Sequence, residues 1–368
     1  MRNLKKVIAL VAVFAMMVST VAFAQTFTDV DEAHDYYEAI EMLSSLNILT
    51  GDDQDGDGKM DFRPNDTITR AEVAAVISRI QNITSAAQTA TEFVDVPASH
   101  WASGYIAQAA GQGIVNGYGD GNFGPDDKVL YEQVVKMLVE TLGYGPYVAD
   151  NGGYPTGHLT AASRYGILEG VVGGAQGAEA NRGMVAQMVY NAIDTPLMDR
   201  WTYGADAEYV IYNGKGDYDY VTLLSRDLGV KKFSGIVASN QVTTLDGSVS
   251  IDTEEDAEIT VEYDGMDYAD SDYTLYECDE IDTLYEGDSE AGKLLGMHVN
   301  AYVRETGRNG EYEIISIAQS NKNKVAEFTL EQYADTKGGY VEYYKNETDR
   351  KFYSYKEKEK TQKMTTSK

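Results

Sequence analysis

The chain repeats itself between residues 27 and about 200, and this repetition constrains the fold more than any other feature. Two openings, FTDVDEAHDYYEAI and FVDVPASHWASGYI, begin at Phe27 and Phe93 and match at a constant offset of 66 residues. Each opening leads into a short helix, a turn-rich loop and a second helix, and a third unit follows more loosely. A unit of about 50 to 65 residues has little core of its own. The three units are therefore expected to pack together and bury their apolar faces jointly.

The second helices of the units are expected at TRAEVAAVISRI, LYEQVVKMLVETL and NRGMVAQMVYNAI. In the first of them, Thr69 and Glu72 have the spacing of a capping box, in which each side chain bonds to the other residue's backbone amide. The first helices end before Gly51, Gly117 and Gly170. We expect a positive φ at these three positions, which glycine tolerates.

Arg70 follows the capping residue, in the first turn of its helix. A cation there opposes the helix dipole, so the helix itself does not require it. Backbone amides at a helix N-terminus, joined by a guanidinium group, would bind a carboxylate or a phosphate. The alternative is a solvent-exposed arginine on a well-capped helix.

The succession FxDV…HWA, GYGDGNFGPDD and ITRAE resembles the S-layer homology domain, a family whose members usually carry three copies. The resemblance covers residues 27 to about 200 and is weaker in the third unit. It implies a pseudo-three-fold all-α bundle of helix-loop-helix repeats at residues 25–86, 91–145 and 146–200. It also implies binding to an anionic, pyruvylated secondary cell-wall polysaccharide.

In this family the TRAE arginine, nearby loop glycines and an aromatic residue are thought to line grooves between units. The resemblance thus implies a polysaccharide site drawn from Arg70, Arg182, Trp101, Asp29, Asp95, Gly117 and Tyr131. Tyr131 replaces the arginine in the second unit, while Asp35 and Tyr154 stand at the place of Trp101 in the other two. These departures predict one or two competent grooves rather than three. Trp101 has an alternative structural role, covering the end of the bundle.

The loop GDDQDGDGKMDF in the first unit is a candidate calcium site. Its candidate ligands are Asp53, Asp55, Asp57 and Asp61. The first eight positions match a calcium-binding loop, but the twelfth, where a bidentate glutamate belongs, is Pro64. A calcium site and a solvated acidic turn both fit this pattern.

The sequence changes character after residue 200. Runs such as FSGIVAS, AEITVEY, MHVNAYVRE and YEIISIA alternate or are β-branched, as are AEYVIYN and YVTLL, and Gly/Asn/Asp turns separate them. We expect a small, mainly antiparallel, barrel-like β domain at residues 201–344, then a basic, flexible tail at 345–368. The fold class is therefore α+β, with several domains.

Charge and targeting signals limit the partners. The chain holds 30 basic and 59 acidic residues, a net charge of −29, which argues against nucleic acid or an anionic membrane surface. Residues 251–290 alone contain 17 acidic residues and no basic one. A basic start, an apolar stretch and Ala22-Phe23-Ala24 predict a signal peptide over residues 1–24, so we expect a secreted protein. The single cysteine, Cys278, excludes an internal disulfide.

These features predict a non-catalytic cell-surface protein of the S-layer type, without membrane insertion. Its expected partners are a secondary polysaccharide attached to peptidoglycan and further copies of itself in a surface layer. No cofactor other than calcium is expected. Two alternatives stay open for residues 201–344: a carbohydrate- or protein-binding module, or a surface hydrolase. Against the hydrolase, this region has no G-x-S-x-G motif and only one histidine, His298.

Overall fold

The computed structural model describes residues 27–31, 33–53, 56–84, 86–200, 209–211, 221–237, 259–262, 284–285, 294, 297–305, 312–319, 333–337, 340–344, 349–354 and 365–366. The expected signal peptide, Cys278 and most of the acidic stretch 251–290 lie outside these residues. The chain divides into two compact units, Val21–Ser320 and a second one formed by Asn321–Lys368 with Met1–Thr20. Within the described ranges, no helix has the length and apolar character needed to cross a membrane.

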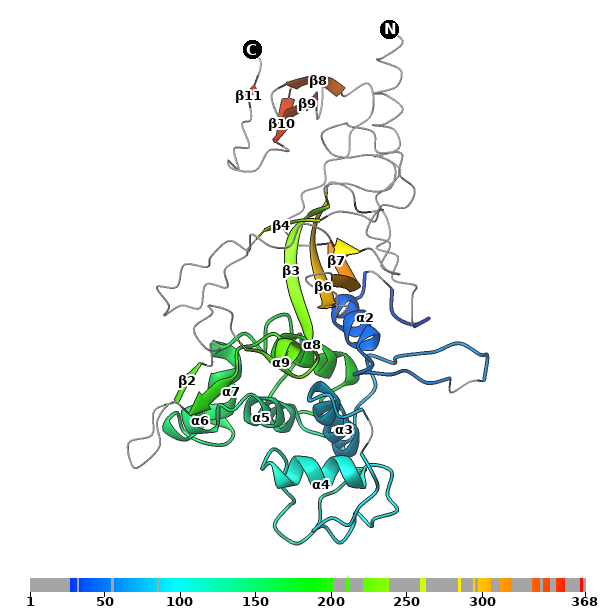
Figure 1. Cartoon of the computed structure of the whole chain (residues 1–368), viewed down its shortest axis with the longest axis vertical. Helices are drawn as coiled ribbons and strands as arrows, with labels where there is room; N and C mark the ends of the chain where they lie inside the picture. Colours follow the sequence, from blue (N-terminus) through cyan, green and yellow to red (C-terminus); the bar gives the residue numbers. More distant parts are fainter. Residues whose placement is uncertain are drawn as a thin grey trace. The chain divides into compact units, whose positions relative to one another are not determined.

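Three helix pairs form the first part of the larger unit (Figure 1). They are α2 (Tyr37–Ser45) with α3 (Arg70–Ile80), α4 (Ser103–Gly111) with α5 (Tyr131–Thr141), and α7 (Thr156–Arg164) with α8 (Arg182–Ile193). The second helix of each pair lies where the sequence predicted it. A further short helix, α6 (Gly145–Asp150), occupies a connection that was expected to be a loop. It has Pro146 in its first turn, where a missing N–H costs nothing.

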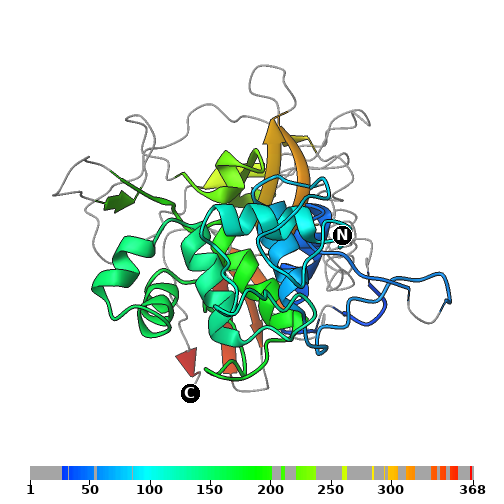
Figure 2. The same cartoon turned by 90° about the horizontal axis from the view of Figure 1, so that it is seen from below.

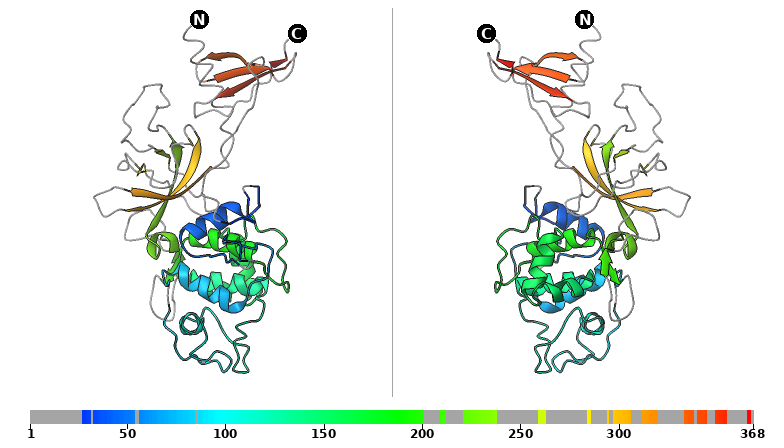
Figure 3. Two further views of the ribbon diagram at one scale, coloured as in Figure 1. Left: turned by 90° about the vertical axis from the view of Figure 1, so that its right-hand side faces the viewer. Right: turned by 90° about the vertical axis from the view of Figure 1, so that its left-hand side faces the viewer.

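The second helix of each unit packs on the first helix of the next. Helix α3 contacts α4, α5 contacts α7, and α8 contacts α2, as the views in Figures 2 and 3 allow the reader to follow. Val73, Val134 and Val185 on the second helices are all buried in one shared apolar core. This joint burial explains how short repeats form a stable body. The pseudo-three-fold symmetry of the arrangement stays a prediction.

The predicted capping box is present at the start of α3. Thr69 Oγ1 accepts a hydrogen bond from the Glu72 amide at 3.2 Å, and Glu72 Oε2 accepts one from the Thr69 amide at 2.7 Å. Helix α8 is capped by Asn181, which accepts from the Met184 amide at 2.8 Å. These caps satisfy amides that a helix leaves unpaired at its first turn.

The expectation of positive φ at three glycines is wrong for two of them. Gly170 has a φ of 72°, but Gly51 and Gly117 are not in the left-handed region. Their reason is close packing. A Cβ on Gly117 would lie 2.8 Å from the Phe93 ring, and one on Gly51 would lie 2.5 Å from the Phe27 ring. The repeat therefore needs glycine so that the aromatic residue of each opening can pack against the loop.

Replacing Gly117 by alanine is expected to lower the free energy of unfolding by about 1–3 kcal/mol, because the added methyl group overpacks a filled site. The matched control is Gly111→Ala at the end of α4, where a Cβ would meet no atom within 4 Å. That change is expected to be neutral or to stabilise by up to about 1 kcal/mol. Urea denaturation of both variants tests this, and equal effects would contradict it.

The larger unit also contains a five-stranded sheet. Its strands are β3 (Val230–Val237), β4 (Ile259–Glu262), β5 (Leu284–Tyr285), β6 (His298–Glu305) and β7 (Tyr312–Gln319). The order is β4-β3-β6-β7-β5, and every pairing is antiparallel except β5 with β7. Four of these strands lie in runs that the sequence predicted as strands, which confirms the mixed α+β class. Closure into a barrel stays a prediction.

One predicted strand is wrong. The run YVTLL does not extend as a strand but leads into a helical turn, α9 (Leu223–Arg226). Thr222 caps it by accepting from the Ser225 amide at 3.1 Å, so a local side-chain bond prevails over the β-branched composition. Before it, β1 (Met198–Arg200) pairs antiparallel with β2 (Tyr209–Ile211).

The smaller unit contains a four-stranded antiparallel sheet in the order β11-β10-β9-β8. Its strands are β8 (Tyr333–Lys337), β9 (Tyr340–Tyr344), β10 (Asp349–Ser354) and β11 (Thr365–Thr366). Two of them lie in the basic segment 345–368, for which the sequence predicted no strand. The domain boundaries proposed from the sequence stay predictions.

A polar joint attaches the five-stranded sheet to the helices. Tyr302 on β6 donates a hydrogen bond to the Tyr190 hydroxyl at 2.7 Å, and Tyr190 donates to Glu38 Oε1 at 2.6 Å. Lys232 Nζ on β3 donates to Asp194 Oδ2 at 2.8 Å. Tyr302 is 2% exposed and belongs to the same core as the helices, and its burial raises its pKa. The sheet and the helices thus share one core.

Replacing Tyr302 by phenylalanine is expected to lower the free energy of unfolding by about 1 kcal/mol, the usual net contribution of a buried hydrogen bond. Tyr118→Phe is the control, because Tyr118 is 51% exposed and loses only a surface bond to Asp127. Its effect is expected to stay within about 0.5 kcal/mol. If Tyr302→Phe is as neutral as the control in urea denaturation, the joint contributes nothing to stability.

Candidate functional site

The N-terminus of each second helix enters the loop of the next unit, which creates three junctions. The first lies between α3 and the α4–α5 loop, the second between α5 and the α7–α8 loop, and the third between α8 and the α2–α3 loop. Loop carbonyls accept from the helix amides: Asp127 from Arg70 at 3.0 Å, Pro125 from Ala71 at 3.0 Å, Ala178 from Tyr131 at 2.9 Å, Asp66 from Arg182 at 2.9 Å, and Pro64 from Gly183 at 2.8 Å. The first amides of α3 are therefore occupied and do not form the anion receptor that the sequence suggested. Any anion must be held by side chains.

Arg70 is buried at the first junction and is not a solvent-exposed arginine. It is 4% exposed, and its guanidinium donates from Nε to the Phe123 carbonyl and from Nη2 to the Asn116 carbonyl, both at 2.9 Å. The group lies 4.6 Å from the ring centre of Phe123 and 4.8 Å from that of Tyr118. Burial lowers its pKa, but an arginine remains charged at neutral pH. No described residue accepts from its Nη1.

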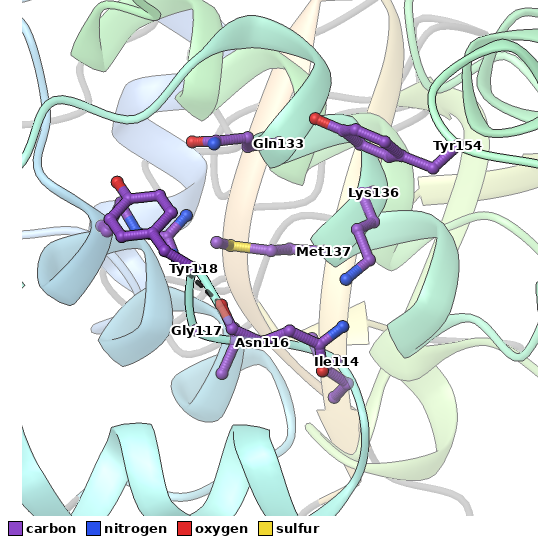
Figure 4. A pocket seen from close by; sticks show the side chains of 10 residues that line it. Ile114, Asn116, Gly117, Tyr118, Gln133, Lys136, Met137 and Tyr154 are labelled. Atoms are coloured by element: carbon purple, nitrogen blue, oxygen red, sulfur yellow. Dashed lines mark hydrogen bonds between the residues drawn. The ribbon is translucent and has the colours of Figure 1, made fainter. Parts of the chain in front are cut away.

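A cavity of about 360 Å³ opens beside Arg70 (Figure 4). Its polar lining consists of Arg70, Asn116, Tyr118, Gln133, Lys136 and Tyr154. In Figure 4, Tyr118 lies on one side of the open space, and Lys136 and Tyr154 lie on the other. The volume is in the lower part of the range for small-ligand sites. The lining combines two cations with two tyrosines that are each 51% exposed.

Lys136 is a site residue that the sequence analysis missed. In the amide orientation that satisfies both of its atoms, the Asn116 side chain accepts from Lys136 Nζ at 2.8 Å and donates to the Val115 carbonyl at 3.0 Å. Burial and the nearby Arg70 cation lower the lysine's pKa, while Glu140 raises it. The signal was present in the sequence, because Lys136 is the only basic residue of α5.

The second junction has no cation in the arginine position. Tyr131 takes that position and is 8% exposed. Its ring lies against Gly174, where an added Cβ would come within 2.1 Å of a ring carbon. Burial raises the pKa of Tyr131, so it remains neutral at physiological pH. This junction has an aromatic contact where the first has a guanidinium.

The third junction repeats the bonding of the first. Arg182 donates from Nε to the Phe62 carbonyl at 2.7 Å and from Nη2 to the Thr50 carbonyl at 2.8 Å. Its guanidinium lies 4.7 Å from the Phe62 ring centre. Burial lowers its pKa, and the Glu72 carboxylate opposes this shift.

The two aspartates implied by the resemblance hold loops rather than line the cavity. Asp29 accepts from the Phe62 and Arg63 amides at 2.7 and 2.6 Å. Asp95 accepts from the Phe123 and Gly124 amides at 2.8 and 2.7 Å. Each carboxylate thus fastens the opening of its unit to its own loop, with both oxygens engaged.

The structure brings only part of the expected site together. Gly117 lines the cavity beside Arg70. Trp101 does not line it, and is 51% exposed with its ring centre 5.9 Å from that of His100. Tyr154, the third-unit counterpart of Trp101, does line it. The aromatic wall of this cavity therefore comes from the third unit and from Tyr118.

The candidate calcium loop shows local turns. Asp53 accepts from the Gly56 and Gly58 amides at 2.8 and 3.0 Å, and Asp57 accepts from the Lys59 amide at 2.8 Å. Asp61 accepts a hydrogen bond from Thr28, and Asp55 lies outside the described residues. Where the structure describes the chain, no three acidic, histidine or cysteine residues come together as a metal site. Calcium binding stays a prediction that titration calorimetry tests, and the absence of heat at millimolar calcium would remove it.

Comparison with known proteins identifies the repeats. The S-layer homology domain model matches residues 26–74 and 92–135. A cell surface protein of Thermoanaerobacter kivui is 33% identical over 206 residues, which cover 54% of this chain and 26% of the relative. The middle cell wall protein of Brevibacillus brevis is 29% identical over 234 residues, which cover 61% of this chain and 21% of the relative.

A further relative is named as an uncharacterized cell wall amidase of Bacillus anthracis. It is 31% identical over 122 residues, covering 33% of this chain and 21% of the relative. The chain thus spans about a quarter or less of the length of each of these three relatives. The matched segments contain the first two helix pairs, including Arg70 and the loop that binds it, and this chain is a protein with S-layer homology domains.

Proposed function

We propose that this chain is a non-catalytic surface protein, held non-covalently on the cell wall by an anionic secondary polysaccharide. A secreted, cell-surface location is indicated by the family match and by the names of the relatives. The observation that carries the proposal is the cavity at the first junction, where Arg70 and Lys136 face a space that two half-exposed tyrosines flank.

The chemistry of the cavity suits a sugar that carries a carboxylate, such as a pyruvyl ketal. A guanidinium group presents a planar set of donors that matches a carboxylate better than an ammonium group does. Tyr118 and Tyr154 offer aromatic faces to the apolar side of a sugar ring. Because Arg70 is buried, its attraction for an anion is screened less by water than that of a surface arginine.

The finer parts of the proposal follow from the same family. The three helix pairs would form a pseudo-three-fold bundle, the β-rich part would be displayed at the surface, and copies of the chain would associate in a surface layer. The amidase relative supports one alternative, a wall-bound hydrolase with its active site in residues 201–344. An assay for release of reducing sugar or free amine from purified walls separates the two, since the non-catalytic protein releases neither.

Co-sedimentation with cell walls tests the proposed anchoring. The full chain is mixed with purified Gram-positive-type walls, and with the same walls after their secondary polysaccharide has been stripped. We expect the protein to pellet with intact walls and to stay in solution with stripped walls. Equal pelleting with both would contradict polysaccharide anchoring, and no pelleting with either would contradict wall binding.

A further inference from the structure

We propose that the first junction is the single anion-binding groove of these repeats, with Lys136 as its second cation, and that Arg182 has a structural role. The groove would take an acidic sugar whose carboxylate accepts from both Arg70 and Lys136. The inference rests on the proposed function for the nature of the ligand. It goes beyond it in the number of sites and in the residue that makes one junction different from the others.

Asn116 links the two cations of the first junction. Its backbone carbonyl accepts from Arg70 Nη2 at 2.9 Å, and its side chain accepts from Lys136 Nζ at 2.8 Å. One residue thus holds both positive groups on the wall of the same cavity. Within the described residues, neither cation has a carboxylate within 4.0 Å. An anion placed between them would relieve their mutual repulsion.

The third junction has the same framework but different lining. The loops align at an offset of 66 residues and the second helices at an offset of 61, so Tyr118, Gln133 and Lys136 correspond to Asp52, Glu72 and Ala75. The shared contacts support the alignment, since Thr50 and Phe62 accept from Arg182 as Asn116 and Phe123 accept from Arg70.

These replacements reverse the charge next to the arginine. Where the first junction has one lysine and two neutral side chains, the third has two carboxylates and one alanine, a difference of three charges. Arg63 pairs with Asp52 at 2.7 Å, yet Asp52 Oδ1 is buried without a hydrogen-bond partner. Such an environment disfavours a second anion. Arg182 is then explained by its two carbonyl bonds and its contact with the Phe62 ring.

The second junction is excluded for a different reason. It has Tyr131 in place of arginine, and Gln187 stands on α8 where Lys136 stands on α5. The Tyr131 ring also occupies the space against Gly174. With neither cation and with its ring packed on the loop, this junction does not bind a carboxylate. One groove in three therefore has the charge, the space and the aromatic faces together.

Titration calorimetry on the full chain tests the inference, with pyruvylated polysaccharide fragments released from Gram-positive walls as the probe. The same fragments without their pyruvate serve as the ligand control. We expect one site per chain for the pyruvylated fragments. Lys136→Gln is expected to weaken binding on the order of 10-fold, as for one lost charge-assisted hydrogen bond, and Lys136→Arg to restore most of it. Thermal melting of each variant verifies that it is folded.

Arg182→Gln distinguishes the junctions, and we expect it to change neither the number of sites nor the affinity. Two sites per chain, one of them lost in Arg182→Gln, would overturn the inference while the proposed function stood. Unchanged affinity in Lys136→Gln would do the same. If the wild-type chain binds neither fragment, the proposed function and this inference both fall.

Discussion

Replacing Arg70 by glutamine is expected to weaken binding to cell walls about 100-fold, or roughly 2.7 kcal/mol. Glutamine is neutral and cannot present the planar pair of donors that a carboxylate accepts from a guanidinium group. The residue is 4% exposed, so water does not replace the lost donors easily. The measurement is the amount of protein that sediments over a range of wall concentrations.

The control for Arg70→Gln is Arg182→Gln, because the two arginines have the same structural bonds. Each donates to two loop carbonyls and lies over a phenylalanine ring, at 4.6 Å for Arg70 and 4.7 Å for Arg182. Both variants should therefore lose a similar amount of stability. Only Arg70→Gln should lose wall binding. Equal loss of binding in both would show that the effect comes from damage to the bundle.

Replacing Phe123 by alanine is expected to lower the free energy of unfolding by about 3–5 kcal/mol. The side chain is fully buried, its ring centre lies 5.3 Å from that of Phe93, and it supports the guanidinium of Arg70. Its removal leaves a cavity where the opening of the second unit meets its loop. Urea denaturation followed by circular dichroism measures the change.

Tyr118→Ala is the control for Phe123→Ala. Tyr118 contacts the other face of the same region but is 51% exposed, so its truncation should cost less than about 1 kcal/mol. A Phe123→Ala variant that unfolds at the same urea concentration as Tyr118→Ala would contradict the assignment of Phe123 to the core.

Local sequence patterns predicted the helices well. The second helix of each unit lies where apolar spacing placed it, and the Thr69–Glu72 capping box formed as predicted. Both signals act within one turn of helix and depend little on the rest of the chain. The same reliance on local rules failed at Gly117, because its constraint is the Phe93 ring, 24 residues away in the sequence.

The site was predicted only in part, because it is assembled from three units. Arg70 comes from the first, Asn116 and Lys136 from the second, and Tyr154 from the third. The resemblance indicated Arg70, but no local pattern shows that Lys136 bonds to the loop that receives Arg70. The helix N-terminal amides were assigned to a ligand because their partners, the Pro125 and Asp127 carbonyls, lie far along the chain.

The most direct test of the account is a crystal structure of the full chain with a pyruvylated wall-polysaccharide fragment. The account predicts the sugar carboxylate within hydrogen-bond distance of Arg70 Nη1 and Lys136 Nζ, with the ring beside Tyr118 or Tyr154. The cavities beside Arg182 and Tyr131 should hold no carboxylate. A fragment bound at Arg182, or on the exposed face of Trp101, with the first junction empty would contradict it.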